Sequence, residues 1–231
     1  MNSTFKFIVL ILMLLSLLAC EKGIQKKEVT LDESETALAN TLGFDREVLL
    51  EVKSYAHVPL SQLKTVFSEY QPETKKIEQT VTRHNGITFS TDQERARKII
   101  LLLKDTLKAK GYRIFLSEMH FGYSPDQVAV IKSDDQFDIL RIKQTDGINY
   151  GLDNNAVITQ LKKWHEMYPF EITGADLDWV EAEFIQQPKD MLQFAKEVYK
   201  FCPDVVEQGT ETVERLAREM KRSNTLYLWW D

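Results

Sequence analysis

Apolar residues recur along most of the chain at spacings that alternate between those of helices and those of strands. Helical spacing predicts helices at residues 34–42, 92–110, from Asp153 or Asn154 to Pro169, 188–202 and 213–220. Short apolar or alternating runs predict strands at residues 48–52, 112–117, 128–131, 137–142, 179–185 and 226–231. Helices and strands mixed at this density predict an α+β fold, with helices packed on a mixed, mainly antiparallel sheet.

Local signals set several boundaries. Thr91 and Glu94 have the spacing of a capping box, so the helix at 92–110 is expected to begin there. The Asn85-Gly86 pair accepts the positive φ angles of a type I′ turn and therefore predicts a hairpin. The polar loop at 133–136 predicts a second hairpin between the runs on either side of it.

The run at 179–185 alternates strictly between apolar and acidic residues. Val180, Ala182 and Phe184 share one face, and Glu181 and Glu183 share the other. We therefore expect one face of this strand to lie in the core and the other to face water.

Two adjacent tryptophans near the C-terminus predict a binding surface. Trp229 and Trp230 must point to opposite faces of a strand, so either the sheet is covered on both faces or one ring is exposed beside Asp231. Exposed tryptophan is a favoured anchor at protein interfaces. Because the loop with Asn149 and Tyr150 is expected to border this end, the candidate binding surface comprises all five residues.

The N-terminal residues are typical of a targeting segment. Residues 1–19 contain an apolar run at 7–18 that is too short to span a bilayer and suits a signal peptide. The following Leu-Ala-Cys resembles the bacterial lipobox, which implies lipidation of Cys20 and attachment to the membrane of the bacterial envelope. Glu21 implies the outer membrane if the cell is Gram-negative. The alternative is an ordinary signal peptide followed by an incidental cysteine.

Composition excludes several classes of protein. The formal charge of −6 becomes −7 when residues 1–19, with Lys6 as their one charge, are removed. An acidic chain without a long basic run does not suit a nucleic-acid binder. The 9 glycines and 6 prolines among 231 residues are too few for a turn-dense all-β sandwich. Residues 20–33 are polar and predict a flexible tether before the folded part.

Cys202 is the strongest nucleophile candidate, since Cys20 would be acylated. A reactive thiolate favours a helix N-terminus or a basic neighbourhood. Cys202 instead ends the predicted helix at 188–202, and Asp204 follows closely. Both features raise the thiol pKa, so we predict a buried structural cysteine.

No pattern of metal ligands is present in the sequence. The four histidines show no paired helical spacing (His57, His84, His120 and His165), and His165 is expected to be half-buried and hydrogen-bonded. Asp176 and Asp178 lack the further ligands of a calcium loop, so turn chemistry explains them. We predict no metal and no cofactor.

Three stretches resemble a known bacterial family. They are residues 145–152 (Thr-Asp-Gly-Ile-Asn-Tyr-Gly-Leu), residues 201–210 around Cys202-Pro203-Asp204, and the terminal Leu-Tyr-Leu-Trp-Trp-Asp at 226–231. Together they resemble the family catalogued as domain of unknown function 4253. The resemblance divides the chain into an N-terminal α/β segment at 34–121 and a C-terminal α+β domain at 122–231. It implies no activity, because the family has none established.

The favoured hypothesis is a lipid-anchored envelope protein that acts as a protein-binding or accessory module without catalysis. The absence of a phosphate loop, nucleophile elbow, metal cluster or dinucleotide fingerprint in the sequence favours binding over catalysis. One alternative is an enzyme that uses Cys202 or a carboxylate pair. A second is an immunity-type protein that neutralises a toxin.

Overall fold

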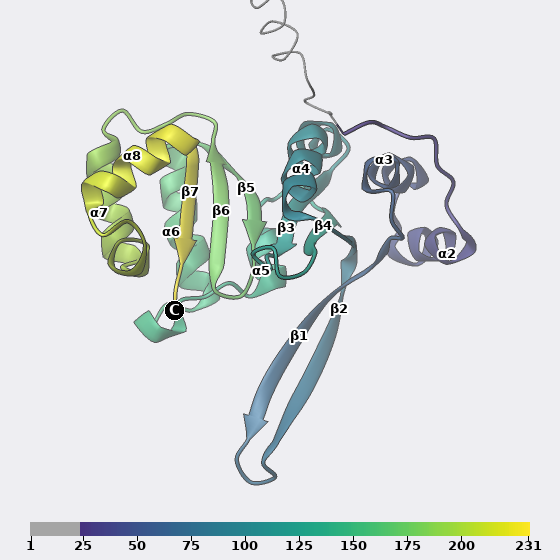
Figure 1. Ribbon diagram of the computed structural model, residues 1–231, viewed down its shortest axis with the longest axis horizontal. Coiled ribbons are helices and arrows are strands. Elements are labelled where there is room, and N and C mark those ends of the chain that lie inside the picture. The colour runs from purple at the N-terminus through teal and green to yellow at the C-terminus, as the bar shows by residue number, and fades with distance from the viewer. Residues whose placement is uncertain (1–23) are drawn as a thin grey trace, which may run out of the picture.

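The protein folds around one seven-stranded sheet. A computed structural model describes residues 24–231, so the predicted signal peptide at 1–19 and Cys20 lie outside the described residues. The strand order is β1-β2-β4-β3-β5-β6-β7 (Figure 1). All neighbours are antiparallel except β3 and β5, which are parallel. The predicted α+β fold with a mixed, mainly antiparallel sheet is confirmed.

The elements follow one another along the chain in mixed order. The strands are β1 (Ser61–Gln71), β2 (Lys76–Thr91), β3 (Tyr112–Glu118), β4 (Asp126–Lys132), β5 (Phe170–Ala175), β6 (Trp179–Phe184) and β7 (Thr225–Trp229). The described α-helices are α2 (Glu33–Leu42), α3 (Arg46–Ala56), α4 (Gln93–Lys108), α5 (Asp138–Lys143), α6 (Asn154–Met167), α7 (Met191–Phe201) and α8 (Val213–Ser223). A 3₁₀ turn, η1 (Ile148–Tyr150), and a π-helical turn, η2 (Val205–Thr210), complete the described set.

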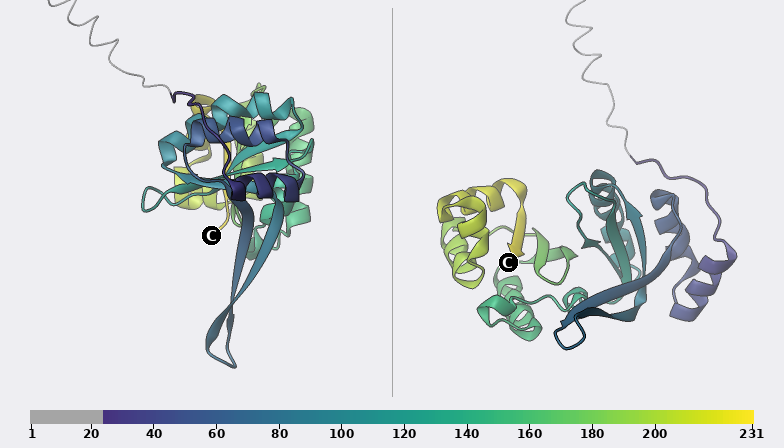
Figure 2. Two further views of the ribbon diagram at one scale, coloured as in Figure 1. Left: turned by 90° about the vertical axis from the view of Figure 1, so that its right-hand side faces the viewer. Right: turned by 60° about the horizontal axis from the view of Figure 1, so that its bottom comes forward.

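Helices pack on both faces of the sheet and enclose two hydrophobic cores. The first core lies beneath α5, α6, α7 and α8 and is centred on Trp164 and Phe194. The second lies beneath α2, α3 and α4 and contains Leu49, Leu103 and Tyr112. Figure 2 shows these helix groups at opposite ends of the elongated body. Each group therefore covers only part of the sheet.

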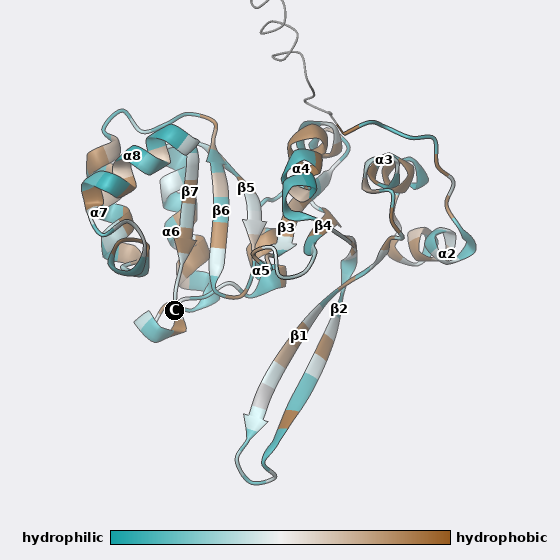
Figure 3. Ribbon diagram, in the orientation of Figure 1, coloured by the Kyte–Doolittle hydropathy of each residue, from teal (hydrophilic) through white to brown (hydrophobic). Residues whose placement is uncertain are grey.

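Two parts of the sheet lack a full helical cover. The face of β6 and β7 opposite the first core is only partly buried, and the β1–β2 hairpin projects from the body as a long ribbon (Figure 1). We call residues 64–85 of this ribbon the β-arm. Figure 3 shows apolar residues along this ribbon among polar ones. These two uncovered regions are considered below as binding surfaces.

The strand predicted at 48–52 is wrong, because the segment forms helix α3. Val48, Leu49, Val52 and Ala56 are all buried in the second core. These residues are spaced three or four positions apart, which places them on one face of a helix. A short apolar run of this kind is also typical of a buried strand, so the sequence pattern does not distinguish the two. Packing of this face against the second core stabilises the helix.

The hairpin predicted at Asn85-Gly86 is also wrong, because both residues lie inside β2 and the turn falls at residues 72–75. The register with β1 shifts beside them, between Gln62 and Lys64, so the pair marks a bulge. A Cβ atom on Gly86 would lie 3.0 Å from Ile131 Cγ2 and from the Val130 carbonyl oxygen. Glycine is needed there for close packing.

Two further boundaries differ from the prediction, and strands β1 and β5 were missed. The run at 137–142 is not a strand; residues 138–143 form helix α5, and Asp138 at its start accepts a hydrogen bond from Ser133 Oγ. Asp92, and not Thr91, caps α4 by accepting the Arg95 amide, since Thr91 still pairs within the sheet. Strand β5 was not predicted, although Phe170 to Thr173 alternate between apolar and polar residues.

The N-terminal described residues lie along the body. Ile24 and Leu31 pack on the second core, and the Lys27 amide donates to the Ser54 carbonyl at 2.9 Å. This part of the predicted tether is therefore docked on α3. The boundary expected near residue 121 falls between β3 and β4, which pair in the same sheet. Within residues 24–231, no helix is both long enough and apolar enough to span a bilayer.

Candidate functional site

The three sequence stretches that resemble the known family meet at the end of β7. Asp204 Oδ1 accepts from the Tyr150 hydroxyl at 2.6 Å and from Gln208 Nε2 at 3.0 Å. Its Oδ2 accepts from the Asp231 amide at 2.9 Å. We call these four residues the C-terminal clamp, because they tie the last residue to η1 and η2.

The clamp holds a carboxylate against a neutral phenol. Burial acts to raise the pKa of Asp204, but the hydrogen bonds from Tyr150, Asp231 and Gln208 outweigh it and lower the pKa below its usual value. The same hydrogen bond raises the pKa of Tyr150 to about 12. Asp204 therefore stays ionised and acts as an acceptor for the chain end.

Two glycines make room for the tryptophan pair. A Cβ on Gly147 would lie 2.8 Å from Trp230 Cδ1, and one on Gly209 would lie 2.6 Å from Trp229 Cη2. Each glycine therefore lets the backbone lie flat against one indole ring. A side chain at either position would displace the ring.

The structure separates the five residues of the candidate binding surface. Trp230 is only 4% exposed and belongs to the first core, so it is not available to a partner. Trp229 is half-buried on the opposite face of β7, whereas Asp231 and Asn149 are exposed. Tyr150 is 40% exposed, but its hydroxyl is engaged in the clamp. Trp230 thus lies in the first core, and Trp229 is partly buried and packs against both cores, so neither ring is freely exposed beside Asp231.

Cys202 is fully buried, as predicted. Its thiol donates to the Trp229 carbonyl at 2.9 Å, and burial raises the thiol pKa to about 12. His165 is half-buried, and its Nδ1 accepts the Phe170 amide at 3.2 Å, as predicted for a hydrogen-bonded histidine. Both side chains have structural explanations.

Across residues 24–231, no three acidic, histidine or cysteine side chains are grouped as metal ligands.

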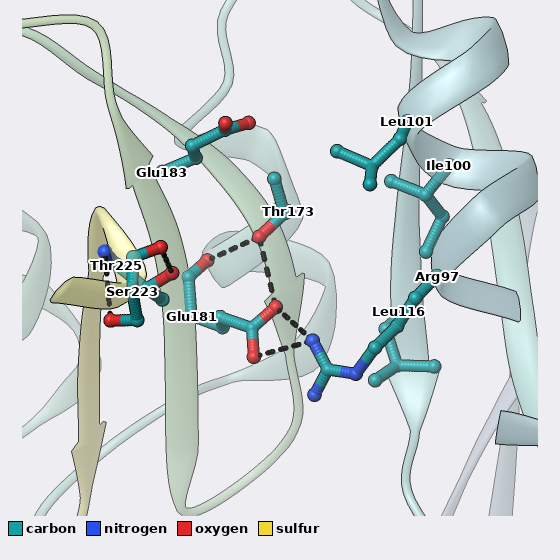
Figure 4. A pocket seen from close by; sticks show the side chains of 9 residues that line it. All are labelled: Arg97, Ile100, Leu101, Leu116, Thr173, Glu181, Glu183, Ser223 and Thr225. Carbon is teal, nitrogen blue, oxygen red and sulfur yellow. Dashed lines mark hydrogen bonds and ion pairs between the residues drawn. The ribbon is translucent and has the colours of Figure 1, made fainter. Parts of the chain in front are cut away.

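A groove lies near Trp229, between α4, the partly buried face of β6 and β7, and α8. It consists of two adjoining cavities of about 180 and 500 Å³. Both are lined by Arg97, Glu181, Ser223 and Thr225, so they form one groove, which we call the α4–β7 groove. Figure 4 shows Leu101 and Ile100 on one wall and Glu181 and Thr225 across from them.

Charged residues cross the floor of this groove in pairs. Arg97 Nη1 donates to both carboxylate oxygens of Glu181, at 2.8 and 2.9 Å, and Thr173 Oγ1 donates to Glu181 Oε1 at 3.2 Å (Figure 4). Lys104 forms an ion pair with Glu183. The acidic face of β6 was expected to face water, but α4 supplies cations to it.

Aromatic rings continue the floor toward η2. Tyr227 stacks on Trp179 with ring centroids 6.0 Å apart and lies 5.9 Å from Trp229. Burial, followed by the charges of Glu181 and Asp178, raises the pKa of Tyr227 to about 12. Its hydroxyl is therefore a neutral donor, and within the described residues it has no hydrogen-bond partner. Beside Trp229, η2 is a π-helical turn, a distortion frequent at functional sites.

Sequence reasoning missed most of the groove. Arg97 and Glu181 lie far apart in the sequence, and only the topology brings α4 over β6. One signal was available, because Leu101 and Leu102 are apolar residues outside the buried stripe of α4. Apolar residues on the outer face of a helix indicate a second contact surface.

We expect Cys202 to be inert in the native protein. A buried thiol with a pKa of about 12 should react with an alkylating reagent at pH 8 at least about a hundredfold more slowly than a free cysteine. Mass spectrometry of the Cys202 peptide measures this rate without interference from Cys20. The same peptide should react rapidly in denaturant, and fast native labelling would contradict the buried assignment.

We expect Asp204→Asn to destabilise the protein in a pH-dependent way. Because the folded-state pKa is lowered, the carboxylate stabilises the fold fully above its unfolded pKa of about 3.9, and this is lost as the pH falls through the folded value. The urea midpoint of the variant should lie below that of the wild type at pH 7, and the difference should shrink below about pH 3.9. Glu28→Gln, at an exposed position, is the control. If the difference in urea midpoint between Asp204→Asn and the wild type did not change with pH, the ionised Asp204 carboxylate would not be what stabilises the fold.

Comparison with known proteins identifies the C-terminal part of the chain. The family model described as Domain of unknown function (DUF4253) matches residues 127–231. No curated protein and no solved structure matches the chain. The matched region begins within β4 and contains the whole C-terminal clamp, but it excludes α4 and the projecting hairpin. Residues 127–231 are therefore a domain of the DUF4253 family.

Proposed function

We propose that this protein is a lipid-anchored component of the bacterial envelope that binds another protein through the α4–β7 groove. One observation carries the binding role: the face of β6 and β7 beside α4 forms the floor of a groove, with partly exposed aromatic side chains and paired charged side chains. A sheet face that is open and partly apolar is unfavourable in water, unless a partner covers it.

The groove has the mixed chemistry that protein segments require. Leu101 is 55% exposed on the α4 wall, and the opposite wall includes Leu216 and Met220, which are only 5% and 3% exposed. Tyr227 and Trp229 supply large aromatic surfaces between them. Aromatic residues are enriched where protein partners bind most strongly. A partner segment would therefore find apolar contacts at the walls and a phenol donor on the floor.

Two features support binding over the catalytic alternative. Cys202 has no exposed surface from which to attack a substrate. Glu181 and Glu183 lie on one face of β6, but each carboxylate is paired with a cation of α4. Pairing with a cation favours the ionised form, whereas a carboxylate pair that acts as acid and base needs one protonated member.

Leu101→Arg should abolish capture of the partner. The added charge would stand at the groove wall, where it would remain unpaired against an apolar contact. We expect at least a tenfold loss of a stoichiometric partner on co-purification from the native envelope, measured by quantitative mass spectrometry.

Leu102→Arg is the matched control. Leu102 is 51% exposed on the same helix but does not line the groove, so capture should be unchanged. If the wild type retains no stoichiometric partner, or if both variants lose it equally, the groove is not the binding site.

Cys20→Ser should release the protein from the membrane. If acyl chains on this cysteine are the anchor, the wild type should sediment with membranes and the variant should remain in the soluble fraction. Cys202→Ala, which leaves Cys20 intact, should still sediment with membranes. Equal sedimentation of Cys20→Ser and wild type would rule out the lipid anchor.

A further inference from the structure

Strand β7 is the last strand of the sheet, so one of its edges has no neighbouring strand (Figure 1). The hydrogen bonds with β6 show which backbone groups point to that free edge. The Trp230 amide donates to the Asp178 carbonyl at 2.9 Å. The Phe184 amide donates to the Asn224 carbonyl, also at 2.9 Å. Because hydrogen-bonded pairs alternate along an antiparallel ladder, the even-numbered residues of β7 pair with β6 and the odd-numbered residues direct their N–H and C=O groups outward.

Side chains of this protein satisfy the two ends of the free edge and leave its middle unpaired. At the start of β7, the Thr225 amide donates to Ser223 Oγ at 3.3 Å. At the end, the Trp229 carbonyl accepts from the Cys202 thiol, and the C-terminal clamp holds the last amide of the chain. Between these ends lie four groups: the Thr225 carbonyl, the amide and carbonyl of Tyr227, and the Trp229 amide. Within residues 24–231, none of the four has a hydrogen-bond partner.

The four unpaired groups lie at the larger cavity of the α4–β7 groove. The three β7 residues that carry them line this cavity of about 500 Å³, and η2 and α8 line its far side. A row of unpaired N–H and C=O groups on an edge strand is a template for pairing with another strand. The row extends from Thr225 to Trp229, or about 14 Å along an extended chain. The groove therefore contains both a space and a hydrogen-bonding template for an added strand.

We propose that the partner of the α4–β7 groove inserts an extended segment beside β7, where its backbone pairs with the four groups as an eighth strand. This inference rests on the proposed function, because it specifies how a protein bound in the groove is held. In strand addition, main-chain hydrogen bonds give affinity and pockets for alternate side chains give specificity. Leu216 and Met220 of α8 and the rings of Tyr227 and Trp229 line the cavity. The inserted segment should therefore carry apolar side chains.

The backbone groups favour a single extended segment over other occupants. A helix pairs its own N–H and C=O groups, so a helix in the groove would leave the four groups of β7 unpaired. A second copy of this chain that paired through its own β7 would bring a second η2 and a second α8 to the same cavity, which η2 and α8 already enclose on one side. A free segment of another protein meets neither obstacle.

Replacing the Tyr227 amide by an ester tests the pairing. The ester lacks the N–H donor but keeps the phenol ring, and the corresponding α-hydroxy acid is incorporated into the full chain by stop-codon suppression. We expect capture of the partner from the native envelope to fall at least about threefold, measured by quantitative mass spectrometry. The urea midpoint should stay close to that of the wild type, since this amide makes no hydrogen bond within the described residues. The same replacement at Tyr123, on the exposed loop between β3 and β4, is the matched control and should leave capture unchanged.

Hydrogen exchange of the captured complex distinguishes a strand from other occupants. The amides of Tyr227 and Trp229 should exchange at least about tenfold more slowly in the complex than in the protein alone. The amides of Leu226 and Leu228, which pair with β6, should exchange slowly in both states. Unchanged exchange at Tyr227 and Trp229, as expected for a helix in the groove, would overturn the proposal. A complex formed only with a second copy of this chain would also overturn it.

The ester variant also separates this inference from the proposed function. If Leu101→Arg abolishes capture and the Tyr227 ester does not reduce it, the groove binds a protein but β7 does not pair with that protein. If the wild type retains no stoichiometric partner, both the groove and the added strand are wrong. Loss of capture in both variants, with capture retained by the Tyr123 ester, is the result that the added strand predicts.

Discussion

A seven-stranded sheet has two faces to cover, and this chain supplies helices for only part of that area. Where cover is complete, the side chains form the two cores around Trp164 and Leu103. Where it ends, apolar side chains face solvent over the α4–β7 groove and along the β-arm. Because apolar surface of this extent is costly in water, both regions are the natural places for other chains to bind. Covering the sheet is therefore the constraint that links fold to function.

The C-terminal clamp decides where the second face is left open. Asp204 fixes the end of β7 through the Asp231 amide and Tyr150, which places Trp230 in the first core. Trp229 must then point to the opposite face, where Gly209 allows η2 to lie against its ring. The clamp residues, which lie within the region matched by the DUF4253 family model, thus act mainly as structural supports. The groove floor depends on them, although the α4 wall lies outside the matched region.

Local sequence patterns predicted the elements that bury one face. They failed for segments in which tertiary packing determines whether a helix or a strand forms. The apolar stripe on α4 and the alternation in β6 were sufficient to predict a helix and a strand, because each element presents one face to a core. The segments at 48–52 and 137–142 contain short apolar runs that suit either structure, and their packing beneath the sheet selects helices. The β-arm was not predicted, because an Asn-Gly pair such as Asn85-Gly86 occurs both at hairpin turns and at β-bulges, and here it marks a bulge. Of the candidate site, Trp229 was predicted but Arg97 was not, since their proximity depends on how α4 crosses the sheet.

The most direct test of this account is hydroxyl-radical footprinting of the protein in its native envelope, compared with the purified chain at high dilution. The account predicts lower labelling in the envelope at Tyr70 and Ile77 of the β-arm, and at Leu101 of the groove. Tyr123, which is 95% exposed on the loop between β3 and β4, should be labelled equally in both states. Equal labelling of the β-arm and the groove in both states, or protection confined to Tyr123, would contradict the claim that the uncovered faces of the sheet are binding surfaces.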